Sequence, residues 1–361
     1  MPEFCSFLVF RPTEIDLIHK ICAEAGWRVR DIEDPTTRYQ FTENSRSQLA
    51  QVSALKDFKV LMEGQQYGRL LVIDCDEEEA DNICNLIWAA NLIIEAFPPE
   101  QSPPSSAFPL PADTTERDTI FQCVFRTDGY FHRFIHREAM PVAVAVAARA
   151  WPDRKLIYAI HKLAMSYRTE CVTPRSMHPH NGRIFAKHTN DFESHVGTSI
   201  AINLAYSAIE ELGLSIKATA DKPRSLSKKD FIWNPEVLEP LKERLAQAGI
   251  DPDRTIDWVA RGDKTEVPIY EMLNEPTEYA DGQEVRDRRV KLYDAINFCE
   301  YLRNQMTAHA FSGNTARLGP YEVYNTQFVA RFLILAKCEL WGVWNSDLHK
   351  RYLVDDASMA K

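Results

Sequence analysis

A proline-rich stretch divides this sequence into two unequal parts. Residues 98–113 read PPEQSPPSSAFPLPAD and contain six prolines among sixteen residues. Proline has no backbone N–H and a fixed φ, so such a stretch cannot form a helix or a central strand. We expect it to be a linker or an extended surface arm, which places the packed domains on either side of it.

Residues 1–97 mix two hydrophobic periods. FCSFLVF and WRVRDIE suit strands, and residues 58–75 suit a two-stranded hairpin, whereas residues 13–25 show the spacing of a helix. A second helix follows the acidic run DCDEEEAD, residues 74–81. That run has the acids for a divalent metal ion, but acids also suit the positive end of a helix macrodipole, which is the simpler explanation. The sequence predicts a small α+β domain here.

Beyond residue 113 the sequence is mostly helical. Residues 114–190 form a helical connecting region, and residues 346–361 a tail. Between them lie four helical segments, at residues 191–213, 234–249, 284–313 and 319–341. A long connection separates the second segment from the third. This pattern predicts a four-helix bundle over residues 191–345, so the fold class is α+β followed by a mainly α region.

Charge and cysteine usage limit where the protein works. The formal net charge is −10, and residues 1–100 carry 9 Lys+Arg against 18 Asp+Glu, so nearly all the acidity lies there. The remainder is close to neutral and leaves room for an anionic ligand.

The eight cysteines are scattered without a close C-x-x-C pair, as in a reducing compartment. With no secretory signal and no membrane-spanning apolar run, we expect a cytoplasmic protein without membrane contact.

The stretch NFCEYLRNQMTAHAFSG, residues 297–313, ends an amphipathic helix in polar residues. The apolar positions of the helix repeat every three or four residues, and the same series reaches His309, with Arg303 on its flank. A guanidinium turned toward a packing surface is costly without partners. Arginine precedes histidine at such a spacing five times in this chain, so spacing alone decides nothing. Only here does asparagine, Asn304, follow the arginine directly.

The segment RNQMTAH resembles the R-N-x4-H motif of HEPN-superfamily ribonucleases, and the upstream LAYSAIEEL is similar to the first helix of their bundle. The resemblance covers roughly residues 191–345; we recognise no family in residues 1–190. It implies an all-α bundle, a homodimer through the motif-bearing helices, and metal-independent cleavage of RNA. It also implies a regulated toxin or an antiviral (anti-phage) defence effector, which an inhibitory or activating partner protein could control.

The residue types suit this chemistry, because RNA carries its own nucleophile, the 2′-OH. His309 could transfer protons near neutral pH, Arg303 could bind phosphate oxygens as a fork, and Asn304 could position either group. On a straight helix, six residues mean about 9 Å of rise and roughly 120° of rotation. Arg303 and His309 of one straight helix therefore cannot both contact one phosphate. They could do so if the helix ends before His309, or a second copy of the chain could complete the site. A structural buried Arg–His pair is the alternative.

Several further residues could support such a site. Tyr206 and Glu210 lie on the first helix of the predicted bundle, where Glu210 could orient Arg303 or pair with Lys217 at the surface. Basic residues of the same region could guide an RNA backbone or simply solvate a surface. These RNA-binding candidates are Lys222, Arg224, Lys228, Lys229, Arg288 and Arg289.

Two histidine-containing segments offer competing sites. His132 and His136 have an i, i+4 spacing that can bind zinc, but the nearby Glu138 is not in the H-E-x-x-H position, so a surface or core histidine pair fits better. The segment CVTPRSMHPHNGR, residues 171–183, could contact an anion, although a solvated loop fits better. We therefore expect no metal ion and no cofactor.

Two other functions stay open. A HEPN-like bundle could be a non-catalytic dimerisation or nucleotide-binding module, with the function carried by the N-terminal half. A zinc hydrolase built on His132 and His136 is a further option. The complete R-N-x4-H pattern favours the ribonuclease, because a scaffold needs none of its chemistry.

Overall fold

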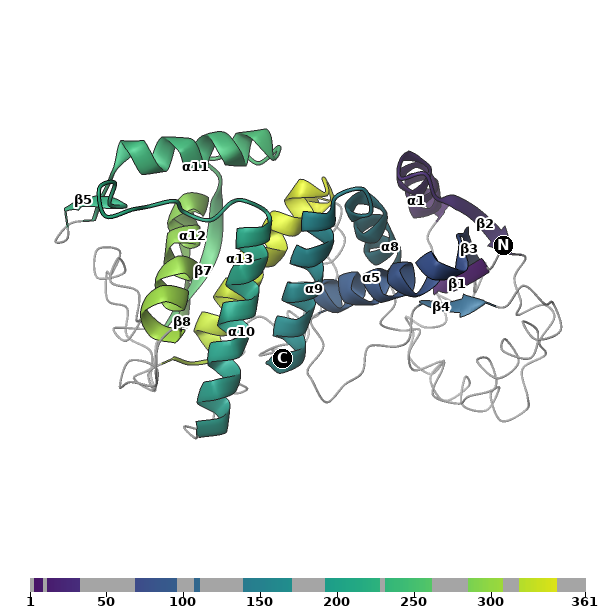
Figure 1. Cartoon of the computed structure of the whole chain (residues 1–361), viewed down its shortest axis with the longest axis horizontal. Coiled ribbons are helices and arrows are strands. Elements are labelled where there is room, and N and C mark those ends of the chain that lie inside the picture. The colour runs from purple at the N-terminus through teal and green to yellow at the C-terminus, as the bar shows by residue number, and fades with distance from the viewer. Residues whose placement is uncertain are drawn as a thin grey trace, which may run out of the picture. The chain divides into compact units, whose positions relative to one another are not determined.

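The chain is mostly helical, with three small antiparallel sheets among the residues that the structure, a computed structural model, describes (Figure 1). These are residues 3–8, 12–32, 69–95, 107–110, 139–170, 192–227, 231–261, 285–307 and 318–342. The chain divides into two compact units. The N-terminal unit comprises Met1–Ile94 and Pro103–Pro152, and the C-terminal unit comprises Glu95–Ser102 and Asp153–Lys361.

The N-terminal unit contains a four-stranded antiparallel sheet with the order β2-β3-β1-β4. Its elements are β1 (Glu3–Leu8), α1 (Pro12–Glu24), β2 (Arg28–Ile32), β3 (Arg69–Asp74), α5 (Glu77–Glu95), β4 (Ala107–Leu110) and α8 (Ala139–Ala150). The first six of these follow a β-α-β-β-α-β order, which with this strand order is the ferredoxin-like arrangement. The described strands and helices of residues 1–97 therefore belong to one sheet and its covering helices. Of the hairpin expected over residues 58–75, the second strand is β3, and the first lies outside the described residues.

Apolar helix faces form the core of this unit. Helix α5 buries Ile83, Leu86, Ile87 and Ile93 almost completely, and α8 buries every residue from Ala143 to Ala148. Helix α1 packs against α8. Trp27, just before β2, makes an edge-to-face contact with Trp151 after α8, with ring centroids 5.8 Å apart.

Part of the proline-rich stretch is a strand rather than a linker. Strand β4 lies within residues 98–113 and pairs with β1, where Pro109 is opposite Phe4. It is the last strand in the sheet order, so its residues need ladder hydrogen bonds on one side only, and a proline is tolerated. Proline thus excluded a central strand, as expected, but did not exclude an edge strand.

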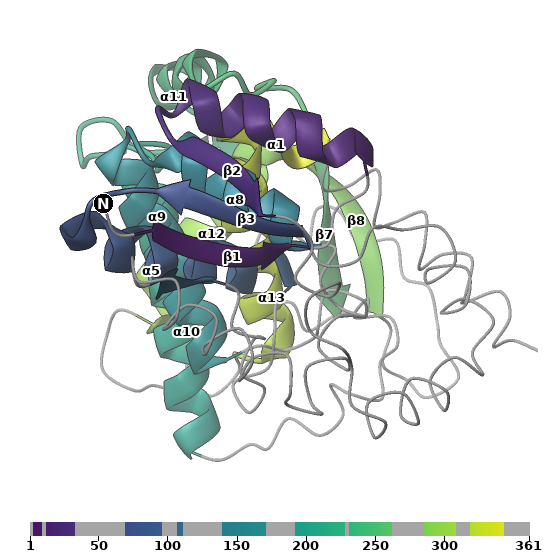
Figure 2. The same ribbon diagram turned by 90° about the vertical axis from the view of Figure 1, so that its right-hand side faces the viewer.

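The C-terminal unit has three long helices that lie side by side in both views (Figures 1 and 2). They are α9 (Arg154–Thr169), α10 (Phe192–Glu211) and α13 (Pro320–Lys337). Its other elements are β5 (Ser225–Ser227), β6 (Ile232–Trp233), α11 (Pro235–Gln247), β7 (Thr255–Arg261), β8 (Val285–Lys291), α12 (Leu292–Tyr301) and the π-helix η5 (Leu302–Thr307). Helix α10 also contacts α12 and η5.

The prediction of one helix over residues 284–313 is wrong for its first turns. Residues 285–291 form β8, which pairs with β7 in an antiparallel ladder where Ile256 is opposite Val290, both buried. Arginine and lysine favour helices in general, but the tertiary pairing overrides that weak propensity. The helix begins only at Leu292, whose N–H donates to the carbonyl of Arg254 at 2.9 Å.

Helix α9 packs along α10 and α13. The predicted bundle began at residue 191 and counted α11 as its second helix, whereas α11 contacts mainly α12. The helices gathered around α10 are α9, α12 with η5, and α13. The C-terminal region is therefore mainly helical, as the sequence predicts.

A set of hydrogen bonds, all with uncharged donors, joins the three long helices α9, α10 and α13. Gln327 on α13 donates through Nε2 to Ser166 Oγ at 2.9 Å and to the Glu170 carbonyl at 2.8 Å. Ser166 in turn donates to the Ala201 carbonyl at 2.7 Å, and Thr198 donates to Glu170 Oε2 at 2.8 Å. We call Ser166, Glu170, Thr198 and Gln327 the helix-junction cluster. It fixes the register of α9, α10 and α13.

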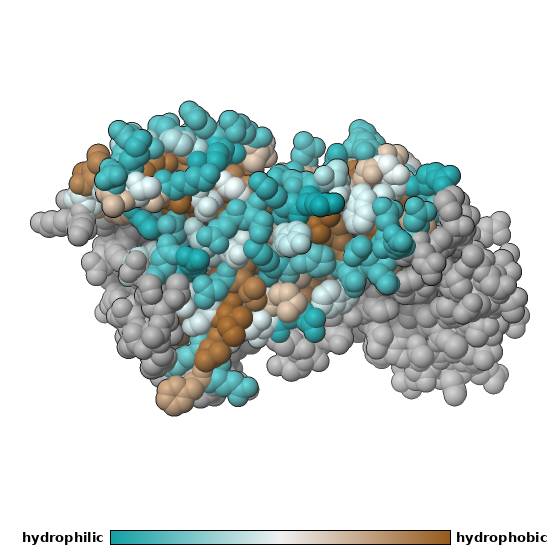
Figure 3. Space-filling model, viewed as in Figure 1, coloured by the Kyte–Doolittle hydropathy of each residue, from teal (hydrophilic) through white to brown (hydrophobic). Residues whose placement is uncertain are grey.

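The N-terminal half of α10 carries an exposed apolar stripe. Phe192, Val196 and Ile200 lie at i, i+4 and i+8 and are 78%, 58% and 44% exposed. Figure 3 shows the stripe in brown along α10. Tyr158 and Met165 on α9 are also exposed. The stripe is the largest run of exposed apolar side chains on any described helix.

In the parts of the chain that the structure describes, no helix has both the length and the apolar character to cross a membrane. Five cysteines there are buried and form no disulfide bond, at positions Cys22, Cys75, Cys84, Cys299 and Cys338. Burial raises the pKa of the Cys84 thiol to about 12 and that of the Cys75 thiol to about 11. Thiols of this kind pack as small hydrophobic groups.

Candidate functional site

The predicted motif begins in a π-helical turn. Helix α12 continues into η5, which contains Arg303 and Asn304, and the Thr307 hydroxyl donates to the Arg303 carbonyl at 3.1 Å. The widened turn means that the straight-helix geometry assumed from the sequence does not apply to these residues. Single π-helical turns within α-helices often lie at functional sites. His309 is outside the described residues, so the structure places two of the three predicted catalytic residues.

Asn304 holds the Arg303 guanidinium. Nη1 of Arg303 donates to Oδ1 of Asn304 at 2.6 Å, and both side chains are half-buried. Within the described residues, no other group accepts a hydrogen bond from this guanidinium. An arginine held at one nitrogen, with further N–H groups directed elsewhere, can bind a phosphate in a fixed orientation.

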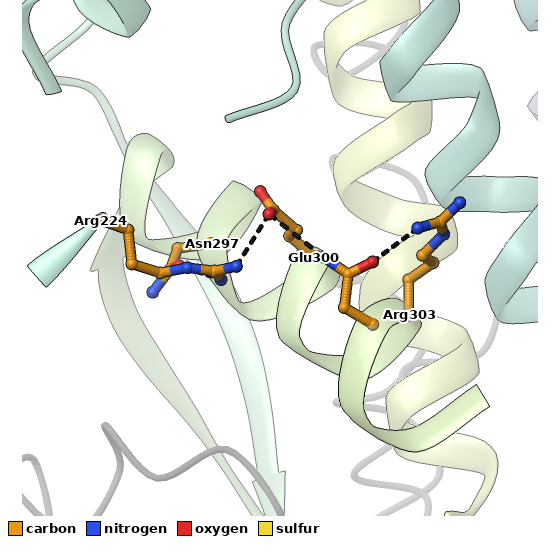
Figure 4. Close-up of polar contacts among 5 residues, drawn as sticks. Arg224, Asn297, Glu300 and Arg303 are labelled. Atoms are coloured by element: carbon orange, nitrogen blue, oxygen red, sulfur yellow. Dashed lines mark hydrogen bonds and ion pairs between the residues drawn. The ribbon is translucent and has the colours of Figure 1, made fainter. Parts of the chain in front are cut away.

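A buried acid, Glu300, stands one turn before this pair. Its side chain is only 8% exposed, and its Oε1 accepts from Nη2 of Arg224 at 2.9 Å and from Nδ2 of Asn304 at 3.2 Å. Arg224 also donates through Nη1 to Asn297 Oδ1 at 3.1 Å. Figure 4 shows these side chains in a row from Arg224 to Arg303. We call Arg224, Asn297, Glu300, Arg303 and Asn304 the motif cluster.

The electrostatics of Glu300 reflect its burial. Desolvation raises the pKa of its carboxyl, with a smaller contribution from the charge of Glu210, while Arg224, the Tyr206 hydroxyl and Arg303 act to lower it. The Tyr206 hydroxyl lies beside this carboxyl and lowers its pKa as a hydrogen-bond donor would. Oε2 of Glu300 is buried without a direct hydrogen-bond partner among the described residues. Such a group costs free energy, and an active site commonly contains one.

The two predicted supporting residues have different positions. Tyr206 on α10 is buried beside Glu300, and desolvation, followed by the charges of Glu300 and Glu210, raises the pKa of its hydroxyl. Glu210 is exposed, and among the described residues it forms an ion pair with neither Arg303 nor Lys217. It therefore influences the site only through its charge, and Asn304 holds Arg303 instead.

The predicted RNA-binding residues do not all lie free on a surface. Arg224 is 28% exposed and belongs to the motif cluster. Lys222 pairs with Glu236 at 3.1 Å, and Arg289 pairs with Asp257 at 2.8 Å. These four side chains are all well exposed, so the pairs are weak and would exchange readily with a phosphate. Arg288 lies on β8.

Several candidates lie outside the described residues. They are His309, Lys228, Lys229, His132, His136 and residues 171–183. The predictions for them stay predictions.

Sequence reasoning missed Glu300 and Asn297, although the sequence contained a signal for both. Asn297, Glu300 and Asn304 follow one another at spacings of three and four, which places them on one helix face among apolar neighbours. A polar row on a helix that is otherwise buried indicates a hydrogen-bonded cluster. The partner Arg224, 76 residues from Glu300, could not have been identified in this way.

The comparisons with known proteins leave the family of this chain open. No protein-family model, no curated protein and no solved structure matches the chain. The resemblance to HEPN ribonucleases therefore still depends on the motif residues themselves.

Proposed function

We propose that the chain is a metal-independent endoribonuclease whose C-terminal unit is a HEPN-like bundle. One observation carries this proposal: Asn304 holds the Arg303 guanidinium on a π-helical turn, and no other described residue accepts from its remaining N–H groups. An arginine that is half-buried for packing alone would be expected to have more partners.

The proposed mechanism needs only groups of the chain and of RNA. The 2′-oxygen attacks the adjacent phosphorus, the P–O5′ bond breaks, and a 2′,3′-cyclic phosphate and a 5′-hydroxyl result. Arg303 binds the phosphate oxygens and stabilises the negative charge of the phosphorane. His309 exchanges a proton with the 2′-hydroxyl or with the leaving oxygen. Asn304 positions Arg303.

A homodimer is part of the proposal, because a second copy could complete the site. Residues 295–300 of α12 are all buried within the chain, so contacts near the motif would involve the half-buried residues of η5. A mass measurement by light scattering at micromolar concentration tests this, and a monomer would contradict it. By analogy with HEPN proteins, we place the enzyme in the cytoplasm as a regulated toxin or antiviral defence effector, under control of a partner protein.

The test uses the requirement for a 2′-hydroxyl. Purified full-length protein is incubated in EDTA with an RNA strand, with the DNA strand of the same sequence, and with DNA strands that carry one ribonucleotide. We expect cleavage of the RNA, none of the DNA, and cleavage of a mixed strand only directly after its ribonucleotide. Cleavage of the all-DNA strand, or complete loss of activity in EDTA, would contradict the proposed chemistry.

One observation favours the non-catalytic alternative. The motif cluster links the segment before β5 to α12 through Arg224, as a purely structural network would. On that reading the bundle is a dimerisation or nucleotide-binding module. Substituting Arg303 would then lower stability, and no RNA would be cleaved.

A further inference from the structure

We infer that Arg224 and Glu300 are positioning residues for Arg303, which they orient through the side-chain amide of Asn304. This inference rests on the proposed function, because the group that they position is the proposed phosphate-binding group.

The contacts that lead from Arg224 to Arg303 start at a backbone segment that hydrogen bonds hold in place. The Arg224 carbonyl accepts from the backbone N–H of Asn234 at 3.0 Å, and the Pro223 carbonyl accepts from the Asn234 side chain at 2.9 Å. Asn234 is also the N-cap of α11. The backbone of Arg224 is therefore tied to the start of a helix, and its guanidinium approaches α12 from a fixed point.

Arg224 in turn fixes the carboxyl of Glu300. Its two terminal nitrogens bind Asn297 Oδ1 and Glu300 Oε1, one turn apart on α12. This two-point contact holds Oε1 in one place, while Oε2 has no hydrogen-bond partner in the described part of the chain. The same Oε1 accepts from Asn304 Nδ2 at 3.2 Å.

The orientation of the Asn304 side-chain amide then follows from hydrogen-bond chemistry. An amide has a donor end and an acceptor end, and Oε1 of Glu300 accepts from the donor end. Oδ1 of Asn304 must therefore face away from Glu300, where it accepts from Nη1 of Arg303 at 2.6 Å. Without an acceptor at position 300, the amide could turn over and direct its NH2 group at the guanidinium. The two donors would repel, and Arg303 would lose its fixed position.

The unfavourable burial of Glu300 supports a functional role. Burying a carboxylate costs free energy, and replacing both members of a buried ion pair by apolar residues is often neutral, so the pair of Glu300 with Arg224 is not needed for stability in general. Its neighbours Ala295, Ile296, Phe298 and Cys299 are buried apolar residues, so the acid is present for its polar partners Arg224 and Asn304 rather than for packing.

The test compares Glu300→Met, which removes the acceptor, with Glu300→Gln, which keeps an acceptor oxygen. The matched control is Glu211→Met. Glu211 on α10 pairs with Lys162 on α9 at 2.7 Å, in the same unit. We expect Glu300→Met to lower RNA cleavage about 10- to 100-fold, the loss typical of a displaced catalytic group. Glu300→Gln should lose much less, and Glu211→Met should match the wild type. Arg224→Gln is a second variant, because its partly exposed side chain is more tolerant of substitution.

A second readout separates positioning from a structural role. Binding of the DNA strand, which is not cleaved, is measured for Glu300→Met alone and in an Arg303→Ala background. We expect weaker binding in the first case and no further effect in the second, since a positioning residue acts only through the residue that it positions.

Each outcome is decisive. Two results would overturn the inference and leave the proposed function standing. The first is that Glu300→Met weakens DNA binding equally in the wild-type and the Arg303→Ala background. The second is that Glu300→Met and Arg224→Gln cleave RNA as fast as Glu211→Met. A wild type that neither cleaves RNA nor binds either strand would overturn the proposed function, and this inference with it.

Discussion

The C-terminal unit contains two polar clusters between helices, and they are built differently. In the helix-junction cluster, a neutral amide and two hydroxyls donate to backbone carbonyls, to a hydroxyl and to one carboxylate oxygen. In the motif cluster, the Arg224 guanidinium binds one buried carboxyl, that of Glu300, whose second oxygen has no hydrogen-bond partner among the described residues, and Asn304 joins this carboxyl to the Arg303 guanidinium.

The difference indicates what each cluster is for. A cluster that fixes helix register is most stable when each of its polar groups has a hydrogen-bond partner. The motif cluster contains charges that are expensive to bury, and the described residues do not satisfy them all. Charge and unused hydrogen-bonding capacity are what a site for an anionic transition state requires. Substitutions should therefore separate the two clusters into one that affects activity and one that affects stability.

The largest effect is expected from Arg303→Ala. RNA cleavage should fall on the order of 100-fold or more, because the group that stabilises the phosphorane is lost. The melting temperature should change little, because the structure shows Arg303 with one side-chain partner. Cleavage rate and thermal unfolding of the same preparation provide the check. A large loss of stability with unchanged cleavage would reverse the assignment of the two clusters.

Gln327→Ala tests the other cluster. It removes two buried hydrogen bonds and leaves a cavity, so the free energy of unfolding should fall by about 2–3 kcal/mol. The cleavage rate per folded molecule should stay the same. Denaturant titration and RNA cleavage at low temperature measure both quantities. Asn325→Ala, on the same helix, removes two hydrogen bonds to Val259 and serves as a control outside both clusters.

A pH effect should be specific to the motif cluster. Burial raises the pKa of Glu300 above its ordinary value of 4.5, so the folded state binds this proton more tightly than the unfolded state. The contribution of Glu300 to stability must therefore fall as the pH rises from about 4.5 through the raised pKa. Glu300→Gln cannot titrate, so its stability relative to wild type should increase over that range. Denaturant unfolding between pH 4.5 and 8 gives the comparison, and parallel curves would count against it.

The smallest effect is expected from Glu211→Gln. Lys162 and Glu211 are about 30% exposed, and the lysine also donates to Ser207 Oγ at 2.8 Å. A pair this accessible to water contributes less than about 1 kcal/mol. Stability should fall by no more than that, and cleavage should not change. A loss of activity would mean that charge anywhere in this unit affects the site, which would remove the contrast between the clusters.

Local patterns in the sequence predicted part of this structure. The spacing of apolar residues indicated α10 and the helix that carries Arg303. The long apolar run indicated α13, of which residues 329–335 are all buried. The edge strand β4 and the strand β8 were missed, since pairing with β1 and β7 outweighs their local propensities. The π-helical turn leaves no mark in residue spacing.

The site was predictable to a similar extent. Arg303 and Asn304 could be found because they are adjacent and polar at the end of an apolar helix. Glu300 could have been found from its spacing to Asn304. The role of Arg224 depends on a contact across 76 residues of sequence, which the fold alone establishes.

The central claim is that Arg303, Asn304 and His309 form a ribonuclease site. The most direct test is RNA cleavage by wild type and His309→Ala, side by side in EDTA, with identification of the product ends. The account predicts 2′,3′-cyclic phosphate and 5′-hydroxyl ends for the wild type and no cleavage by the variant. Equal cleavage by both proteins would contradict it, as would a wild type that is inert toward every class of RNA.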